Sequence, residues 1–395
     1  MIKRIYFDYA STTPVAPEVL KAMLSYFSEK FGNPSSIHAE GVVAKKALDA
    51  GRKSVAGILQ AHADEIVFTS GGTEANNLAI FGIAAAYTKL HKPQTRISTS
   101  KNLHIITTNI EHSSVLEPIR KLERRLASVT YVPVEPSGIV DPKKIAAALR
   151  PKTVLVSVGY ANNEIGTIQP LREISKLLRN FADTKGFTKT IFHSDASQAA
   201  LYLDCSPEQL GVDLLTLDGH KMYGPKGVGA LYARRGTPLE PLLVGGGQER
   251  GLRSTTENVP AIVGFARAFQ IAAAARGKES ARLTKLRDYF YSQILKNLRI
   301  DSVVLNGDAK ERLPNNINIS IPGVDTEFVL LKLDALGIAC STKSSCLGHE
   351  PGSYVVRALG GREARTNSTL RFTFGRETTK KDIDILFQRL SKIVR

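Results

Sequence analysis

Lys221 lies in a turn rich in glycine and proline between two apolar runs, in the stretch TLDGHKMYGPKGVGALY (216–232). Other polar residues that could do chemistry also follow apolar runs: Asp195 ends one of them, and His112 and Asn163 each follow another. In FTSGGTEANN (68–77), a glycine pair precedes a predicted helix start, where free backbone N–H groups and the helix dipole favour a phosphate. Each feature taken alone is also common as a helix cap or a surface residue.

A phosphate cradle, an acid at a strand end and a lysine in a tight turn are together what pyridoxal phosphate requires of a protein. Lys221 would hold the aldehyde of the cofactor covalently. Asp195 would pair with the pyridine nitrogen, so that the ring stays protonated and accepts electrons. The alternative for Lys221 alone is a surface lysine in a turn. The other parts of the pattern favour the cofactor.

Seven short apolar runs predict the strands that position these residues. They are DEIVFTS (64–70), LHIITTNI (103–110), ASVTYVPV (127–134), TVLVSVGY (153–160), KTIFHSDA (189–196), VDLLTLD (212–218) and GVGALYAR (227–234). Most are followed by a polar turn and an amphipathic stretch such as 170–186, which predicts an α/β domain with a mostly parallel sheet. The ligand crevice of such a sheet lies beyond the carboxyl ends of its strands.

The chain of 395 residues predicts two domains. A glycine-rich stretch (244–260) gives way to a long helical run (261–299), and strands near 315–321 and 368–374 with helices at 327–337 and 379–394 indicate a smaller α+β domain. We expect a large domain over 15–257 and a small domain made of 1–14 and 258–395.

The composition limits the classes of function that the chain can have. Lys plus Arg number 53 against 37 Asp plus Glu, which gives +16, but the basic residues are scattered, so a solvated basic surface is favoured over a nucleic-acid site. Cys205, Cys340 and Cys346 match neither a disulfide framework nor a zinc-binding spacing. No apolar run approaches the length that spans a membrane. We therefore expect a cytoplasmic protein with no metal site.

The chain resembles the cysteine desulfurases of the class V aminotransferase family, over nearly its whole length. The matching stretches are YFDYASTTP (6–14), FGNPSSIHAEG (31–41), FTSGGTEANN, EHSS (111–114), NNEIG (162–166), SDASQA (194–199), DGHKMYGPKGVGALY (218–232), GGGQERGLRSTTENVP (245–260), SYVVRALG (353–360) and LRFTFGRETT (370–379). The resemblance implies a fold type I pyridoxal-phosphate-dependent transferase, with a large domain built on a mostly parallel seven-stranded sheet and a smaller α+β domain.

The resemblance also implies roles for individual residues. Lys221 is similar to the lysine that carries the cofactor, His112 to the imidazole stacked on its ring, and Asp195 to the partner of the pyridine nitrogen. The remaining positions that match cofactor or substrate contacts are Gln198 and Asn163 at the ring oxygen, Gly72, Thr73 and His220 at the phosphate, Thr256 at the phosphate of the partner subunit, and Arg371 at the substrate carboxylate.

Cys346 matches the nucleophile that takes sulfur from substrate cysteine as a persulfide, and a thiolate in a glycine-containing loop suits that attack. Cys340, in the apolar run LGIACS, is expected to be buried and inert. The chain departs from the family at Asp218, where a small hydroxyl residue is usual, at Thr255 and Lys343, where glycine is usual, and in a stretch after Cys346 that is one residue shorter.

The activity implied is conversion of L-cysteine to L-alanine with sulfur left on Cys346 for an acceptor protein, such as an iron-sulfur scaffold or a carrier for tRNA thiolation. The implied enzyme is a homodimer. The alternatives are a selenocysteine lyase or another class V lyase and, because Asp218 places a carboxylate beside a phosphate, a cofactor-poor scaffold subunit of a sulfur-transfer complex.

Overall fold

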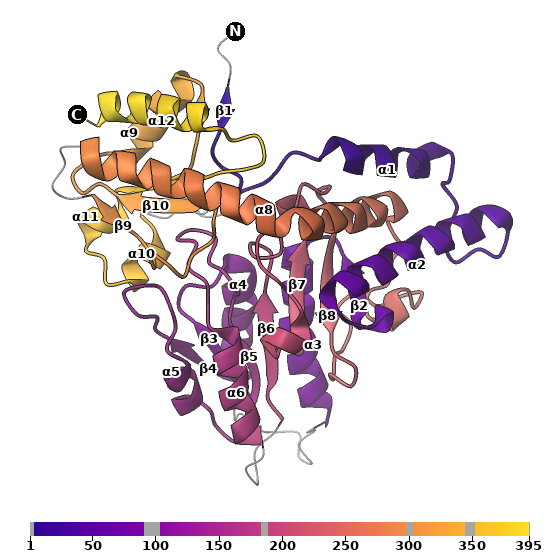
Figure 1. Ribbon diagram of the computed structural model, residues 1–395. Helices are drawn as coiled ribbons and strands as arrows, with labels where there is room; N and C mark the ends of the chain where they lie inside the picture. Colours follow the sequence, from indigo (N-terminus) through magenta and orange to yellow (C-terminus); the bar gives the residue numbers. More distant parts are fainter. Residues whose placement is uncertain (1–3, 91–102, 183–188, 298–302, 344–351, 395) are drawn as a thin grey trace.

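A computed structural model describes residues 4–90, 103–182, 189–297, 303–343 and 352–394. At its centre is a seven-stranded sheet in the order β2-β8-β7-β6-β5-β3-β4, in which β8 alone runs antiparallel to its neighbours (Figure 1). Its strands are β2 (Ile66–Thr69), β3 (Leu103–Thr108), β4 (Ala127–Val132), β5 (Thr153–Ser157), β6 (Ile191–Asp195), β7 (Leu214–Asp218) and β8 (Gly229–Ala233). The predicted α/β class, mostly parallel sheet and seven strands are confirmed.

Helices cover both faces of this sheet because most of its strands are apolar on both sides. α3 (Gly72–Leu90) and α4 (Ser113–Glu123) pack on one face, around a core that includes Leu78 and Ile105. The core of the other face contains residues of α2 (Ala39–Leu59), α6 (Leu171–Ala182) and α8 (Val259–Asn297), such as Leu48, Ile174 and Phe265.

The C-terminal region forms a separate three-stranded antiparallel sheet in the order β12-β10-β9. Its strands are β9 (Val304–Leu305), β10 (Asn316–Ser320) and β12 (Thr369–Thr373). The N-terminal β1 (Ile5–Tyr6) pairs in parallel with β11 (Ile338–Ala339), so the start of the chain joins this region. That pairing agrees with the proposed assignment of 1–14 to the small domain, which stays a prediction together with the boundary at 257.

The other elements connect and cover these sheets. They are α1 (Pro17–Ser28), η1 (Ala63–Glu65), α5 (Pro142–Ala147), α7 (Pro207–Leu210), η2 (Gly219–Lys221), η3 (Glu249–Gly251), α9 (Thr326–Ala335), α10 (Tyr354–Ala358), α11 (Glu363–Thr366) and α12 (Lys380–Ile393). The long helix α8 crosses above the large sheet and reaches from α1 and α2 to the C-terminal elements (Figure 1). It therefore packs against both regions of the molecule.

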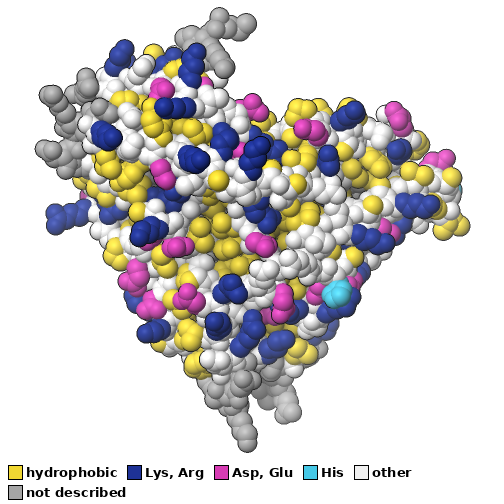
Figure 2. Space-filling model, viewed as in Figure 1, with side chains coloured by type: hydrophobic (Ala, Val, Ile, Leu, Met, Phe, Trp, Pro, Cys, Tyr) yellow, Lys and Arg dark blue, Asp and Glu magenta, His cyan; other side chains and the backbone are white. Residues whose placement is uncertain are grey.

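The positive charge is spread over the face of the molecule that Figure 2 shows. On the face seen in Figure 2, Lys and Arg side chains lie scattered among Asp and Glu and form no continuous patch. This distribution agrees with a solvated basic surface. Within the described ranges, no helix combines the length and apolarity needed to cross a membrane.

Candidate active site

A cavity of about 200 Å³ opens beyond the carboxyl ends of the parallel strands, where the sequence predicted a crevice. The segments after β3, β5, β6 and β7 all reach it. It is lined by Ala10, Ser11, Gly72, Thr73, Ile110, Glu111, His112, Ser114, Gly159, Ala161, Asn162, Asn163, Gln169, Asp195, Ser197, Gln198, Asp218, His220, Lys221 and Arg371. Of the predicted site residues that the structure describes, all except Thr256 are among them.

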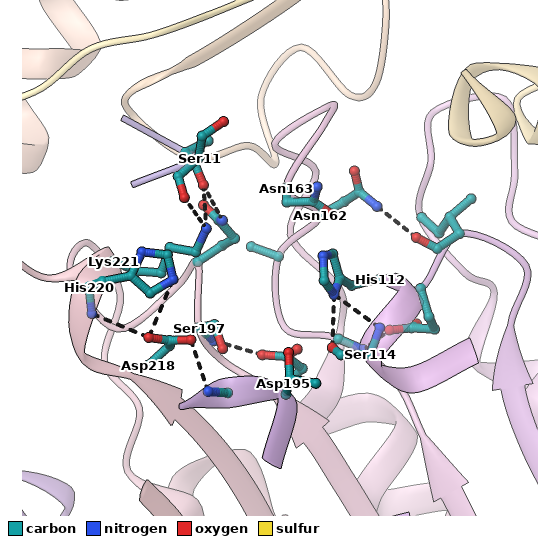
Figure 3. A pocket seen from close by; sticks show the side chains of 18 of the residues that line it. Ser11, His112, Ser114, Asn162, Asn163, Asp195, Ser197, Asp218, His220 and Lys221 are labelled. Carbon is teal, nitrogen blue, oxygen red and sulfur yellow. Dashed lines mark hydrogen bonds and ion pairs between the residues drawn. The ribbon is translucent and has the colours of Figure 1, made fainter. Parts of the chain in front are cut away.

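Lys221 lies at the end of η2, directly after β7, and its side chain projects into the cavity (Figure 3). Its Nζ donates hydrogen bonds to the backbone carbonyls of Ala10 and Ser11, each at 2.7 Å. The neighbouring turn is fixed by Thr13, whose hydroxyl donates to the carbonyl of His220 and accepts from the N–H of Tyr223. The amine is thus held at a defined position by uncharged acceptors.

Asp195 ends β6 and is oriented by two donors. Its Oδ2 accepts from Nδ2 of the buried Asn76 at 2.7 Å, and its Oδ1 accepts from the N–H of Ser197 at 2.9 Å. The same Asn76 amide donates to Oγ of Ser114, which in turn bonds Nδ1 of His112 at 2.8 Å. Asp195 and His112 are therefore linked through one chain of hydrogen bonds. Burial lowers the pKa of His112.

One end of the cavity carries the features of a phosphate cradle, with a carboxylate inserted. α3 begins at Gly72, and a Cβ added there would lie 2.9 Å from Oγ of Ser197 and 3.0 Å from Oδ2 of Asp218, so a larger residue would require one of these side chains to move. The Gly72 N–H already donates to Asp218 Oδ2 at 2.9 Å, and Asp218 Oδ1 accepts from the His220 N–H at 3.2 Å. Asp218 thus faces the predicted phosphate position and also caps η2.

The charge of Asp218 is stabilised locally. Burial opposes its ionisation, but the hydrogen bonds from His220 and Gly72 and the charge of Lys221 outweigh burial and lower its pKa. His220 lies beside it, with Nε2 at 3.5 Å from Oδ1, and the other ring nitrogen, Nδ1, bonds Oγ1 of Thr12. An ionised carboxylate therefore takes one of the backbone donors that a phosphate would use.

Arg371, on β12, brings a cation from the C-terminal sheet to the cavity. Its side chain is only 1% exposed, and its Nη2 donates to Asp8 Oδ1 at 2.7 Å and to Ser11 Oγ at 2.9 Å. Its Nη1 donates to the carbonyl of Asn163 at 2.9 Å, whereas Nε has no partner among the described residues. Asp8, Ser11 and the carbonyl of Asn163 thus hold the guanidinium, and its Nε–H is left to donate to an anion.

The other predicted residues are placed as follows. Asn163 and Gln198 both line the cavity, and Nε2 of Gln198 donates to the carbonyl of Ala10. Thr256 is exposed and lies outside this cavity. Cys346 lies outside the described residues. Cys340 is partly buried against the core, and burial raises the pKa of its thiol to about 12, as expected for an inert cysteine.

Two contributions to the cavity went unassigned in the sequence. Backbone and side-chain groups of the N-terminal segment 8–13 bond Lys221, His220, Gln198 and Arg371, although the segment looks like an ordinary polar turn. Glu111 is buried, accepts from Oγ1 of Thr108 at 2.6 Å and from the N–H of Gly159 at 2.9 Å, and burial raises its pKa to about 7. The sequence does carry a signal for Glu111, because this carboxylate directly follows the predicted strand run 103–110.

The chain was compared with protein families, curated proteins and solved structures. Residues 5–386 match the model of the family described as aminotransferase class-V. Cysteine desulfurase IscS of Dictyoglomus turgidum is 44% identical, over 100% of this chain and 95% of its own length. Cysteine desulfurase IscS 1 of Archaeoglobus fulgidus is 41% identical, over 98% and 96% of the two chains.

Solved structures with a similar fold point to the same family as these relatives. A NifS-like protein superposes with a TM-score of 0.89 at 34% identity, and the match covers 99% of both chains. A structure described as SspA in complex with cysteine superposes with a TM-score of 0.78 at 34% identity, and the match covers 93% of this chain and 98% of that one.

Proposed function

The chain belongs to the aminotransferase class-V family, and on that premise we propose that it is a cysteine desulfurase that uses pyridoxal phosphate to convert L-cysteine to L-alanine. The single observation that carries the proposal is the convergence of Lys221, Asp195, His112 and Arg371 on one cavity from four different segments of the chain. We also propose that the reaction takes place in the cytoplasm.

The residues fit the cofactor at its ring. Lys221 supplies the attachment point, Asp195 supplies a carboxylate already oriented by Asn76 and Ser197, and His112 supplies a partly buried imidazole. When bound, pyridoxal phosphate supplies the electron sink on which the chemistry depends. Its phosphate would lie at the start of α3, where Gly72, Thr73, His220 and the nearby Ser197 would bind it. The neighbouring carboxylate of Asp218 would weaken this binding.

Three residues act on the substrate in this proposal. Arg371 binds the α-carboxylate through the donors that Asp8, Ser11 and Asn163 leave free, and Lys221 transfers protons at the substrate carbons once its amine is released. Cys346 attacks the substrate sulfur as a thiolate. The carbon–sulfur bond breaks, a sulfur–sulfur bond forms on Cys346, and the carbon gains the hydrogen, so that cysteine and one enzyme thiol give alanine and one persulfide.

The proposed enzyme is a homodimer in which Thr256 reaches the phosphate of the neighbouring subunit. Its support is that Thr256 is exposed and does not line its own cavity, while α1 presents Leu20, Leu24 and Phe27 on one exposed face. The sulfur acceptor is proposed to be a protein, for example an iron-sulfur scaffold. Capture of proteins from the cell extract on the persulfidated enzyme would identify it.

A spectrum of the purified protein separates the enzyme from a cofactor-poor scaffold subunit. The enzyme is expected to bind pyridoxal phosphate with a visible absorption band, and borohydride should abolish the band and leave the cofactor attached to the Lys221 peptide. A protein that acquires no band at saturating cofactor contradicts the proposal. A preference for selenocysteine over cysteine under matched conditions would favour the lyase instead.

A further inference from the structure

Arg371 already meets one carboxylate of the protein, that of Asp8. The Arg371 side chain is only 1% exposed, and its Nη2 lies 2.7 Å from Asp8 Oδ1. Within the described part of the chain, Asp8 is the one ion-pair partner of Arg371, because the other two acceptors are the uncharged Ser11 Oγ and Asn163 carbonyl. A buried guanidinium without a counter-ion is costly. Asp8 therefore compensates the same charge that a carboxylate ligand would use.

Asp8 is fixed by its backbone and does not line the cavity. Its backbone bridges to Thr373 on β12, two residues after Arg371. Its carbonyl accepts hydrogen bonds from the N–H of Ser11 and from the hydroxyl of Tyr6, each at 3.0 Å. Arg371 and Ser11 are lining residues of the cavity, whereas Asp8 is not. A carboxylate that enters the cavity would therefore contact Arg371 while Asp8 stays in place.

Two carboxylates would then share one buried cation. Repulsion from Asp8 reduces the attraction between the ligand and Arg371, because like charges repel more strongly where burial excludes water. Without the charge of Asp8, the ligand would be the first counter-ion of an unpaired buried guanidinium, and pairing such a charge is strongly favourable. The charge of Asp8 thus opposes the binding of a carboxylate at Arg371.

We propose that Asp8 limits the affinity of the cavity for the carboxylates of substrate and product, and that it thereby favours the release of L-alanine. The inference rests on the proposed function, because it takes Arg371 as the group that binds the α-carboxylate. Cysteine and alanine carry the same α-carboxylate, so a site with an unpaired buried cation would also retain the product. Asp8 touches neither molecule in this role and acts through Arg371.

The test is Asp8→Asn, which removes the charge and keeps the size of the side chain. Calorimetry on the cofactor-saturated protein measures the Kd of 3-mercaptopropionate, which has the carboxylate and thiol of cysteine but no amine, and the Kd of its uncharged amide. We expect the variant to bind the acid at least ten-fold more tightly than the wild type does, and the amide equally well. The Kd of L-alanine should fall in the same direction.

Glu249→Gln is the matched control. It removes the charge from a similarly buried ion pair, in which Glu249 Oε1 lies 2.5 Å from Nη2 of Arg52, and neither residue lines the cavity. We expect this variant to lose thermal stability, as Asp8→Asn does, and to keep the wild-type affinity for the acid. Lost stability alone therefore cannot account for a gain of affinity that is confined to Asp8→Asn.

Unchanged or weaker binding of the acid by Asp8→Asn would overturn the inference, and so would a gain that the amide shares. If the variant does not fold by itself, the acid should restore its folding at concentrations at which the amide does not, and failure of that rescue would also overturn the inference. If the wild type forms no alanine from cysteine, the proposed function fails, and the role in product release fails with it. If the wild type forms alanine and the affinities do not differ, only the inference about Asp8 is overturned.

Discussion

Arg371 is a buried cation whose neighbours determine what it can bind. Asp8, Ser11 and the carbonyl of Asn163 hold its guanidinium, and Nε stays without a partner among the described residues. A buried guanidinium with spare donors suits a carboxylate, which it meets through two parallel hydrogen bonds. A lysine in its place offers a single point charge and lacks this planar fork.

We therefore predict that Arg371→Lys raises the KM for cysteine by roughly ten-fold, with a smaller loss of kcat, because a carboxylate clamp chiefly supplies ground-state binding. Steady-state kinetics of alanine release measure both constants. An unchanged KM would show that the carboxylate is bound elsewhere.

Asp218 is the residue at which the cavity differs most from a simple phosphate cradle. Its lowered pKa keeps it charged, and its Oδ2 occupies the Gly72 N–H. We predict that Asp218→Ser binds pyridoxal phosphate more tightly by about 1 to 3 kcal/mol, because a repulsive charge leaves and a donor is gained.

Titration of the cofactor-free protein with pyridoxal phosphate decides this prediction, and thermal unfolding of the same sample controls for the lost cap of η2. The titration should be repeated with pyridoxal, which lacks the phosphate and should show no gain. A serine variant that binds pyridoxal phosphate no better than the parent would mean that the carboxylate does not oppose the phosphate.

The central sheet could be predicted from the sequence because its strands are short apolar runs bounded by polar turns. Each predicted run contains one observed strand, and the strand-end residues Asp195 and His112 lie where a parallel sheet brings them together. The segment 8–13 could not be assigned a role in this way, because its carbonyls reach Lys221 across more than two hundred residues of chain. Such contacts depend on how β1 pairs with β11, and local sequence does not encode that pairing.

Buried histidines make the sheet sensitive to acid. His104 on β3 bonds the hydroxyls of Thr153 and Thr130, and burial lowers its pKa to about 4 from an ordinary value of 6.5. Between these two pH values His104 is protonated in the unfolded chain but stays neutral in the folded chain. The free energy of unfolding therefore falls as the pH falls. Glu111 acts in the opposite sense, because its raised pKa lets the folded chain bind a proton first.

We predict that His104→Gln reduces the loss of stability between about pH 7 and about pH 5 by about 1 to 2 kcal/mol. Urea unfolding at the two pH values measures the difference. A variant with the same pH dependence of stability as the wild type would show that the pKa of His104 is the same in the folded and the unfolded chain.

A group of exposed apolar side chains lies on α1 and on the segment that follows it. Leu20, Leu24 and Phe27 recur at helical spacing on α1, and Phe31 and Ile37 follow it. Apolar side chains in such number on one surface indicate a protein interface. The proposed dimer would cover them and bring Thr256 to the neighbouring cavity.

We predict that Phe27→Lys combined with Phe31→Lys gives a monomer with weakened cofactor binding, because each cavity then lacks the Thr256 of its neighbour. Sedimentation and cofactor titration measure the two effects. Leu331→Lys, at a similarly exposed apolar position on α9, should stay a dimer. Loss of the dimer with full cofactor affinity would contradict a shared site.

Lys221 and Cys346 are the two groups that must act together in the proposed reaction. The direct measurement is incubation of the cofactor-saturated protein with L-cysteine, followed by quantification of alanine and of persulfide on the Cys346 peptide, for the wild type, Lys221→Ala and Cys346→Ser. We predict alanine and persulfide in equal first-turnover amounts from the wild type and neither from the folded Lys221→Ala protein, because its attachment point and proton-transfer group are gone. Cys346→Ser should form no persulfide. Wild-type turnover by Lys221→Ala, or persulfide on another cysteine with Cys346 unmodified, would contradict the account.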